Sequence, residues 1–137
     1  MTISIPEMKL LLDTCALLHF SLDPNRLSAA ALHQITAPDT EVWCSPISIG
    51  EVACLQQRGR IEINGHWKTW FRTLLHTNGW NLLPITGEII EEAWSLLEPI
   101  HRDPADRILI ASSRIYRIPL ITTDSLILDY PHVEALS

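Results

Sequence analysis

The sequence lacks the features that would place it in several large protein classes. It has no apolar run of about 18 residues, the length that a transmembrane helix needs. Its N-terminus does not pair a charged segment with a short apolar stretch, so no secretory signal is predicted. The three cysteines, Cys15, Cys44 and Cys54, are odd in number and show no CxxC spacing. We therefore expect free thiols and a cytoplasmic location.

Several functional motifs are absent as well. Neither GxxxxGK[ST] nor GxGxxG occurs, so neither a P-loop nor a dinucleotide site is predicted, and GxSxG is missing too. None of the six histidines belongs to an HExxH pair. Positive charge is also scarce, because Lys9 and Lys68 are the two lysines and the net charge is −6. This balance argues against a simple basic nucleic-acid binder.

The chain has the size and composition of one globular domain. Its 137 residues are 47% hydrophobic and 19% charged, enough to bury a core without disulfides. We expect a single domain over residues 1–137, in which 1–7 form a peripheral N-terminal extension. Either Met1 or Met8 then serves as the native start.

Short apolar runs alternate with segments of helical periodicity. We predict strands at 9–13, 41–44, 81–85 and 119–123, with a further short strand at 132–135. Helices are predicted at 14–20, 26–36, 48–58, 67–78, 89–97, 103–116 and 126–128. This alternation is typical of parallel strands joined by right-handed crossovers, and so of an α/β sandwich.

The clearest helical periodicity lies in an aromatic-rich segment. Its apolar positions follow i, i+3, i+4, i+7 and i+8 spacing at Trp67, Trp70, Phe71, Leu74 and Leu75. Aromatic side chains also stack on nucleic-acid bases, but this spacing favours a buried face or a partner interface.

Four acidic residues lie where apolar runs stop: Asp13, Glu51, Asp106 and Asp124. If the runs are parallel strands, their carboxyl ends meet at one edge of the sheet, where ligands bind in open α/β folds. Oxygen-rich clusters of this kind bind divalent cations such as Mg²⁺ or Mn²⁺. The positions alone therefore predict an acidic metal site.

Each acid also has a simpler interpretation as a helix cap. Asp13 and Asp124 suit an N-cap, and Ser48 with Glu51 matches a capping box. The segment 103–106 reads as an N-cap Asp, a Pro at N1 and an acid at N3. Capping does not require four carboxylates at one edge, where like charges destabilise each other. The set therefore favours the metal site.

Four segments carry a resemblance to a known family. They are KLLLDTCALL, ISIGEVACL, HRDPADRILIASS and LITTDSLILDY, which occur in this order from about Met8 to Leu136. With them the chain resembles the PIN-domain family, and within it the VapC-like toxins of bacterial toxin–antitoxin pairs. The resemblance implies a three-layer α/β/α sandwich with a short, mainly parallel central sheet.

The resemblance also implies a metal-dependent endoribonuclease. It assigns catalysis to Asp13, Glu51, Asp106 and Asp124, of which the three aspartates would be ligands of Mg²⁺ or Mn²⁺. Asp103 lies one helical turn before Asp106 and either assists the metal or only caps its helix. Supporting roles are expected for Thr122 and Thr123, which would orient Asp124, and for Arg102 and Arg107, which would contact phosphate.

The implied partners are an RNA substrate, a small VapB-like antitoxin and a second copy of the chain. Two other kinds of protein remain as alternatives. Phosphoaspartate enzymes also place an Asp after the first strand, but they need a late lysine, and this chain has none after Lys68. A PIN-like scaffold that binds RNA or protein without cutting is the second alternative.

Overall fold

Five short parallel strands form a single sheet with β1 at its centre. The computed structural model describes residues 8–99 and 103–137 of the chain. The strands pair in the order β3-β2-β1-β4-β5. Their bounds are β1 (Met8–Leu12), β2 (Thr40–Cys44), β3 (Asn81–Leu82), β4 (Leu120–Ile121) and β5 (Ala135–Leu136). In the register, Leu12 lies between Cys44 and Ile121, so three strands end side by side.

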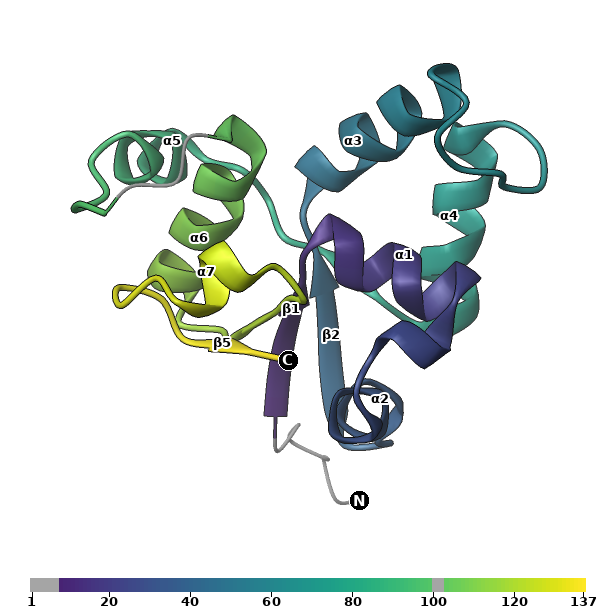
Figure 1. Cartoon of the computed structure of the whole chain (residues 1–137), viewed down its shortest axis with the longest axis horizontal. Helices are drawn as coiled ribbons and strands as arrows, with labels where there is room; N and C mark the ends of the chain where they lie inside the picture. Colours follow the sequence, from purple (N-terminus) through teal and green to yellow (C-terminus); the bar gives the residue numbers. More distant parts are fainter. Residues whose placement is uncertain (1–7, 100–102) are drawn as a thin grey trace, which may run out of the picture.

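Helices cover both faces of this sheet (Figure 1). They are α1 (Thr14–Leu22), α2 (Ala29–Thr36), α3 (Pro46–Gln57), α4 (Trp67–Asn78), α5 (Gly87–Ala93), α6 (Pro104–Tyr116) and α7 (Ser125–Leu128), with a short 3₁₀ turn η1 (Pro24–Arg26). Leu10 and Leu12 of β1 pack in one core with Phe71 of α4. Leu11 points to the opposite face and packs with Leu109 of α6. The predicted three-layer α/β/α sandwich is confirmed.

Several predicted boundaries differ from the structure. Helix α3 begins at Pro46, two residues before the predicted start at Ser48, and Ser45 is its N-cap. Helix α5 ends at Ala93, whereas its apolar spacing predicted a helix to Leu97. β3 and β4 contain two residues each and are shorter than their apolar runs. The predicted extension at 1–7 lies outside the described residues.

The aromatic stripe of α4 belongs to the core. Phe71 is 1% exposed, and Trp67, Trp70, Leu74 and Leu75 pack against the same buried cluster. The helix ends at Gly79, whose φ of 66° is the left-handed conformation that a glycine C-cap favours. The buried face that the spacing predicted is therefore present.

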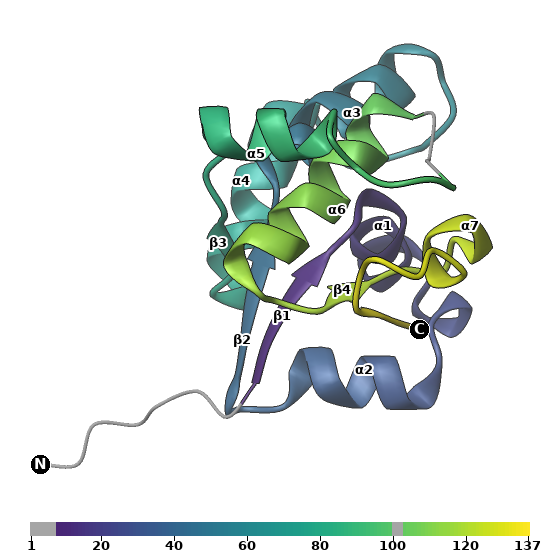
Figure 2. The same cartoon turned by 90° about the vertical axis from the view of Figure 1, so that its left-hand side faces the viewer.

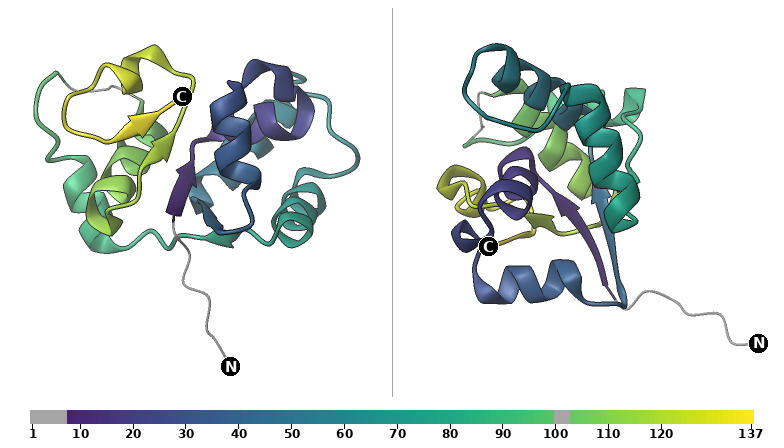
Figure 3. Two further views of the ribbon diagram at one scale, coloured as in Figure 1. Left: turned by 90° about the horizontal axis from the view of Figure 1, so that it is seen from below. Right: turned by 90° about the vertical axis from the view of Figure 1, so that its right-hand side faces the viewer.

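The C-terminus closes the far edge of the sheet. β5 pairs with β4, and the carbonyl of Ser137 accepts a hydrogen bond of 3.1 Å from Ser28, the N-cap of α2. Figure 3 shows the chain end lying beside the start of α2. Among residues 8–99 and 103–137, no helix has both the length and the apolar composition needed to cross a membrane.

Candidate active site

The predicted acids converge at the carboxyl ends of the central strands. Asp13 follows β1 and Asp124 follows β4, whereas Glu51 lies midway along α3 and Asp106 in the first turn of α6, and these two helices contact each other beyond the tips of β1 and β2 (Figures 1 and 2). The negative charges of all four carboxylates act on the thiol of Cys15. Its pKa rises to about 11, through burial first and then through their negative charges. We call these four acids, together with Asp103, the acidic edge.

Asp13 is the most deeply placed of these carboxylates, with 3% of its surface exposed. Its Oδ1 accepts a 2.7 Å hydrogen bond from the backbone N–H of Ala16, and its Oδ2 accepts one from the hydroxyl of Thr122. Burial raises its pKa from 3.8 to about 6, and Asp124 and Glu51 add to the rise. The two hydrogen bonds lower the pKa without offsetting burial. Asp13 is therefore fixed in orientation and costly to ionise.

Glu51 is held by a second hydroxyl group. The hydroxyl of Thr14, at the start of α1, donates to Oε1 of Glu51 and also lies 2.8 Å from the hydroxyl of Ser48. Burial raises the pKa of Glu51, the Thr14 hydrogen bond lowers it, and Asp103 raises it. The sequence analysis did not identify Thr14. In the sequence, Thr14 could have been identified as a hydroxyl residue directly after the strand-end Asp13.

Asp106 carries the strongest electrostatic perturbation of the acidic edge. This half-buried residue lies in the first turn of α6. Its pKa rises from 3.8 to about 7, through burial first and then through Asp103, Glu51, Asp124 and Asp13. Every one of these contributions raises the pKa. A positive charge at the acidic edge would therefore stabilise the ionised form of Asp106 and lower its pKa.

Three of the acids also cap helices, as the simpler interpretation predicted. Asp13, Asp103 and Asp124 are the N-caps of α1, α6 and α7 and accept backbone N–H bonds at 2.7, 2.9 and 2.9 Å. The predicted capping box at Glu51 is wrong. Because Ser45 is the N-cap, Glu51 is the sixth residue of α3 and too far along to reach the cap. Capping therefore does not explain Glu51.

The two threonines after β4 differ sharply. Thr122 is fully buried, donates to Asp13 and accepts a 3.0 Å hydrogen bond from the backbone N–H of Asp124. It therefore joins two members of the acidic edge. Thr123 is exposed.

Arg107 points toward α5 and lies over an indole ring. Its Nη1 donates to the carbonyl of Ala93 at 3.4 Å, and its guanidinium carbon lies 5.9 Å from the ring centroid of Trp94. A phosphate contact would require Arg107 to give up both partners. Arg102, the other predicted phosphate contact, lies outside the described residues.

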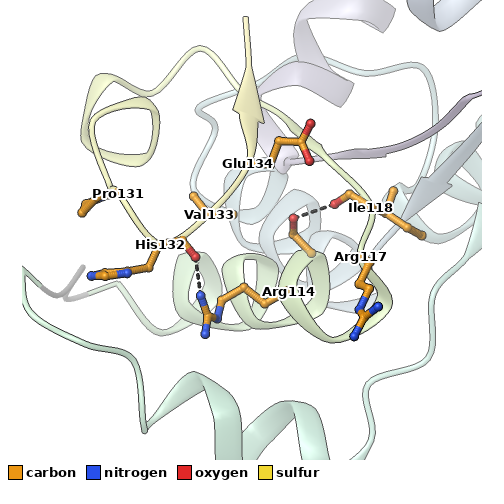
Figure 4. Close-up of a pocket in the computed structure, with 8 residues that line it drawn as sticks. Arg114, Arg117, Ile118, Pro131, His132, Val133 and Glu134 are labelled. Atoms are coloured by element: carbon orange, nitrogen blue, oxygen red, sulfur yellow. Dashed lines mark hydrogen bonds between the residues drawn. The ribbon is translucent and has the colours of Figure 1, made fainter.

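A pocket lies at the other end of α6 (Figure 4). Its volume is about 560 Å³, and its lining includes Arg114, Arg117 and Glu134. Arg114 binds Glu92 at 2.8 Å and donates to the carbonyl of His132 at 2.5 Å, which fixes the segment before β5. No member of the acidic edge lines this pocket. Arg114 therefore has a structural role.

The chemistry of the acidic edge suits a divalent cation. Carboxylate oxygens are the ligands that Mg²⁺ and Mn²⁺ prefer, and a cation would offset the burial and the like-charge repulsion that raise the pKa values of Asp13 and Asp106. Within the described part of the chain, however, no three His, Cys, Asp or Glu side chains form a ready metal-binding group. The chemistry of the donors nevertheless fits such an ion.

A protein-family comparison is consistent with this fold and site. Residues 10–132 match the model of the PIN domain. The chain belongs to the PIN-domain family. A PIN-domain relative, Ribonuclease VapC22 of Mycobacterium tuberculosis, is 30% identical over 125 residues, which span 89% of this chain and 92% of that protein.

Solved structures with the same fold come from toxin–antitoxin complexes. VapBC2 from Rickettsia felis, bound to a DNA fragment from its promoter, matches with a TM-score of 0.69 at 10% identity, covering 94% of this chain and 98% of that chain. VapBC-1 from nontypeable Haemophilus influenzae matches with a TM-score of 0.66 at 16% identity, covering 95% and 98%. A toxin–antitoxin complex from Klebsiella pneumoniae matches with a TM-score of 0.61 at 21% identity, covering 93% and 95%. At these identities the likeness concerns the fold.

Proposed function

We propose that this protein is a metal-dependent endoribonuclease, the toxin of a toxin–antitoxin pair. The observation that carries the proposal is the acidic edge itself. Its carboxylates come from four separate segments of a PIN domain and lie near the carboxyl ends of the central strands, where burial and then neighbouring negative charges raise the pKa values of Asp13, Glu51 and Asp106. A relative that matches most of this chain is named a ribonuclease.

Asp13, Asp106 and Asp124 would hold one or two Mg²⁺ or Mn²⁺ ions, with Asp103 as a further candidate. A bound cation of this type lowers the pKa of water and stabilises negative charge on phosphate oxygens. Asp13 is the fixed point of the set, since Thr122 and the Ala16 N–H hold both of its oxygens. Glu51 would either bind the cation or orient the attacking water.

The test is cleavage of RNA by the purified protein with Mn²⁺ or Mg²⁺, with and without EDTA. We expect cleavage that needs the cation and falls by roughly a hundredfold or more in Asp106→Asn, because metal-held charge stabilisation contributes several kcal/mol. RNA-end mapping after brief expression would identify the sites that are cut.

Asp39→Asn is the matched control. Asp39 is exposed and lies just before β2, at the opposite edge of the sheet from the acidic edge. It should keep wild-type activity. Cleavage that persists in EDTA and in Asp106→Asn would refute the metal-nuclease proposal. A folded protein that binds RNA and never cuts it would support the PIN-like scaffold instead.

We further propose a small VapB-like antitoxin as partner, a homodimer as the working form and the cytoplasm as the location. Support for the antitoxin comes from the fold, which matches chains in toxin–antitoxin complexes. Co-expression with the product of a short upstream reading frame should give a stable complex without RNase activity. Light scattering of the free protein, which should give twice the chain mass of 15.5 kDa, tests the dimer.

A further inference from the structure

We infer that the hydroxyl groups of Ser48 and Thr14 form a one-way hydrogen-bond chain that positions Glu51 for the reaction. The inference rests on the proposed function, and it assigns positioning roles to two residues outside the acidic edge. The chain links α1 to α3, because Thr14 belongs to the first helix and the other two residues to the second.

The direction of the chain follows from its donors. An ionised carboxylate can only accept hydrogen bonds, so Thr14 must donate its single hydroxyl proton to Oε1 of Glu51. The 2.8 Å contact between the two hydroxyls must then be donated by Ser48. This arrangement commits Oε1 to Thr14, and we assign Oε2 to a cation or a water molecule.

Burial makes the chain hard to replace with solvent. Ser48 is fully buried and Thr14 is 6% exposed, so water has little access to the donors. Removing a buried donor leaves its acceptor unsatisfied, which costs more than the bond itself contributes. Glu51 would then either turn away from its present position or become protonated.

The two hydroxyls differ from three other helical hydroxyls of this protein. Ser21, Thr36 and Ser112 each bond to a backbone carbonyl four residues earlier in their own helices. Such bonds are local and do not link a helix to another element. Thr14 and Ser48 instead bond across two helices, and the pair ends on an acidic residue. Because the chain ends on Glu51, the two hydroxyls have a role beyond helix stability.

The test compares Thr14→Val with Thr14→Ser and measures both RNA cleavage and Mn²⁺ binding. Valine keeps the size of the side chain and removes the donor, whereas serine keeps the donor. We expect kcat to fall by about 10–100-fold in Thr14→Val with KM changed little, since loss of groups that orient a metal ligand has effects of this size. Thr14→Ser should recover most of kcat. Mn²⁺ affinity, followed by EPR, should weaken in Thr14→Val and recover in Thr14→Ser.

Ser48→Ala is the second variant and Ser112→Ala its control. Both serines are fully buried in helices, but Ser112 bonds to the carbonyl of Ile108 and does not reach Glu51. Ser48→Ala should lower kcat and Mn²⁺ affinity, whereas Ser112→Ala should leave both unchanged. If Thr14→Val does not fold, Ser48→Ala decides the inference alone.

The failures of the two proposals are distinguishable. Wild-type protein that cuts no RNA with any divalent cation would overturn the proposed function, and the Mn²⁺-binding series would still test the hydroxyl chain. Active wild-type protein with unchanged kcat and Mn²⁺ affinity in Thr14→Val or Ser48→Ala would overturn the chain alone. A Thr14→Ser variant as impaired as Thr14→Val would also overturn it, because the hydroxyl would then not be the group that matters.

Discussion

The inner and outer halves of the acidic edge are built differently. The inner carboxylates, Asp13 and Glu51, each accept a hydrogen bond from a buried threonine, Thr122 and Thr14 respectively. The outer half comprises the first turn of α6 and the start of α7, where Asp103 is exposed and the other acids are only partly covered.

The comparison separates fixed carboxylates from adjustable ones. Asp13 is buried and bonded on both oxygens, so it cannot turn to meet an ion and sets the place where the ion must lie. Asp106 and Asp124 are less buried than Asp13, so burial restricts their side chains less. Within residues 8–99 and 103–137, the cluster is electrostatically coupled but forms no ready metal-binding group.

The largest effect is expected from Asp13→Asn, which should separate activity from stability. RNA cleavage should fall by roughly a hundredfold or more, because the fixed ligand is lost. The metal-free variant should nevertheless be more stable than wild type at pH 8, by about 2–3 kcal/mol, since it no longer buries an ionised carboxylate with a pKa of about 6. Urea unfolding measures this gain, and a variant less stable than wild type would contradict it.

Stability of the metal-free wild type should depend on pH with a defined sign. The folded pKa values of Asp13, about 6, and Asp106, about 7, both lie above the ordinary 3.8. Their contribution to stability is therefore fully present below pH 3.8 and is lost as the pH rises through 6 and 7. The melting temperature should fall between pH 4 and 8, and saturating Mn²⁺ should reverse most of the fall at pH 8. A melting temperature that rises over this range without metal would contradict the burial of these acids.

Thr122→Val and Thr123→Val form a matched pair from adjacent positions. Thr122 links Asp13 to the Asp124 backbone, whereas Thr123 is exposed. Cleavage should fall by about tenfold in Thr122→Val, since it loses a group that orients a metal ligand. Thr123→Val should stay close to wild type. Equal losses in the two variants would remove the distinction between fixed and adjustable acids at this strand.

The smallest effect is expected from Asp103→Asn. Asparagine is as good an N-cap as aspartate, so α6 should keep its start. An exposed charge contributes at most about 1 kcal/mol, so cleavage should fall by less than about fivefold. Side-by-side RNA cleavage assays of Asp103→Asn and Asp106→Asn check this. A loss as large as that of Asp106→Asn would make Asp103 a full member of the metal site.

The layer architecture could be predicted because apolar runs and helical spacing alternate along the whole chain. The prediction failed at helix starts. The Ser45–Pro46 pair is a strong N-cap signal, yet Ser48 three residues before Glu51 also matches a capping box, and local spacing does not choose between them. Helix α5 is shorter than its apolar spacing because Leu96 packs into the core from beyond its end.

The strand-end acids could be predicted because topology alone brings strand ends together. Their partners could not be predicted in the same way. Contacts such as Thr14 with Glu51 depend on how two helices pack, and a sequence pattern within one helix carries no record of that packing. The direction of Arg107 toward Trp94 is likewise a result of how α5 and α6 pack.

The pairing of Asp13 with Thr122 spans 109 residues and has a consequence for biosynthesis. The first acid is made early in translation, but β4, which lies beside β1 and directly precedes Thr122, is made about a hundred residues later. A ribosome that has not yet made β4 therefore carries no assembled acidic edge. Under the proposed function, the nuclease is thus inert on the ribosome until β4 has been made.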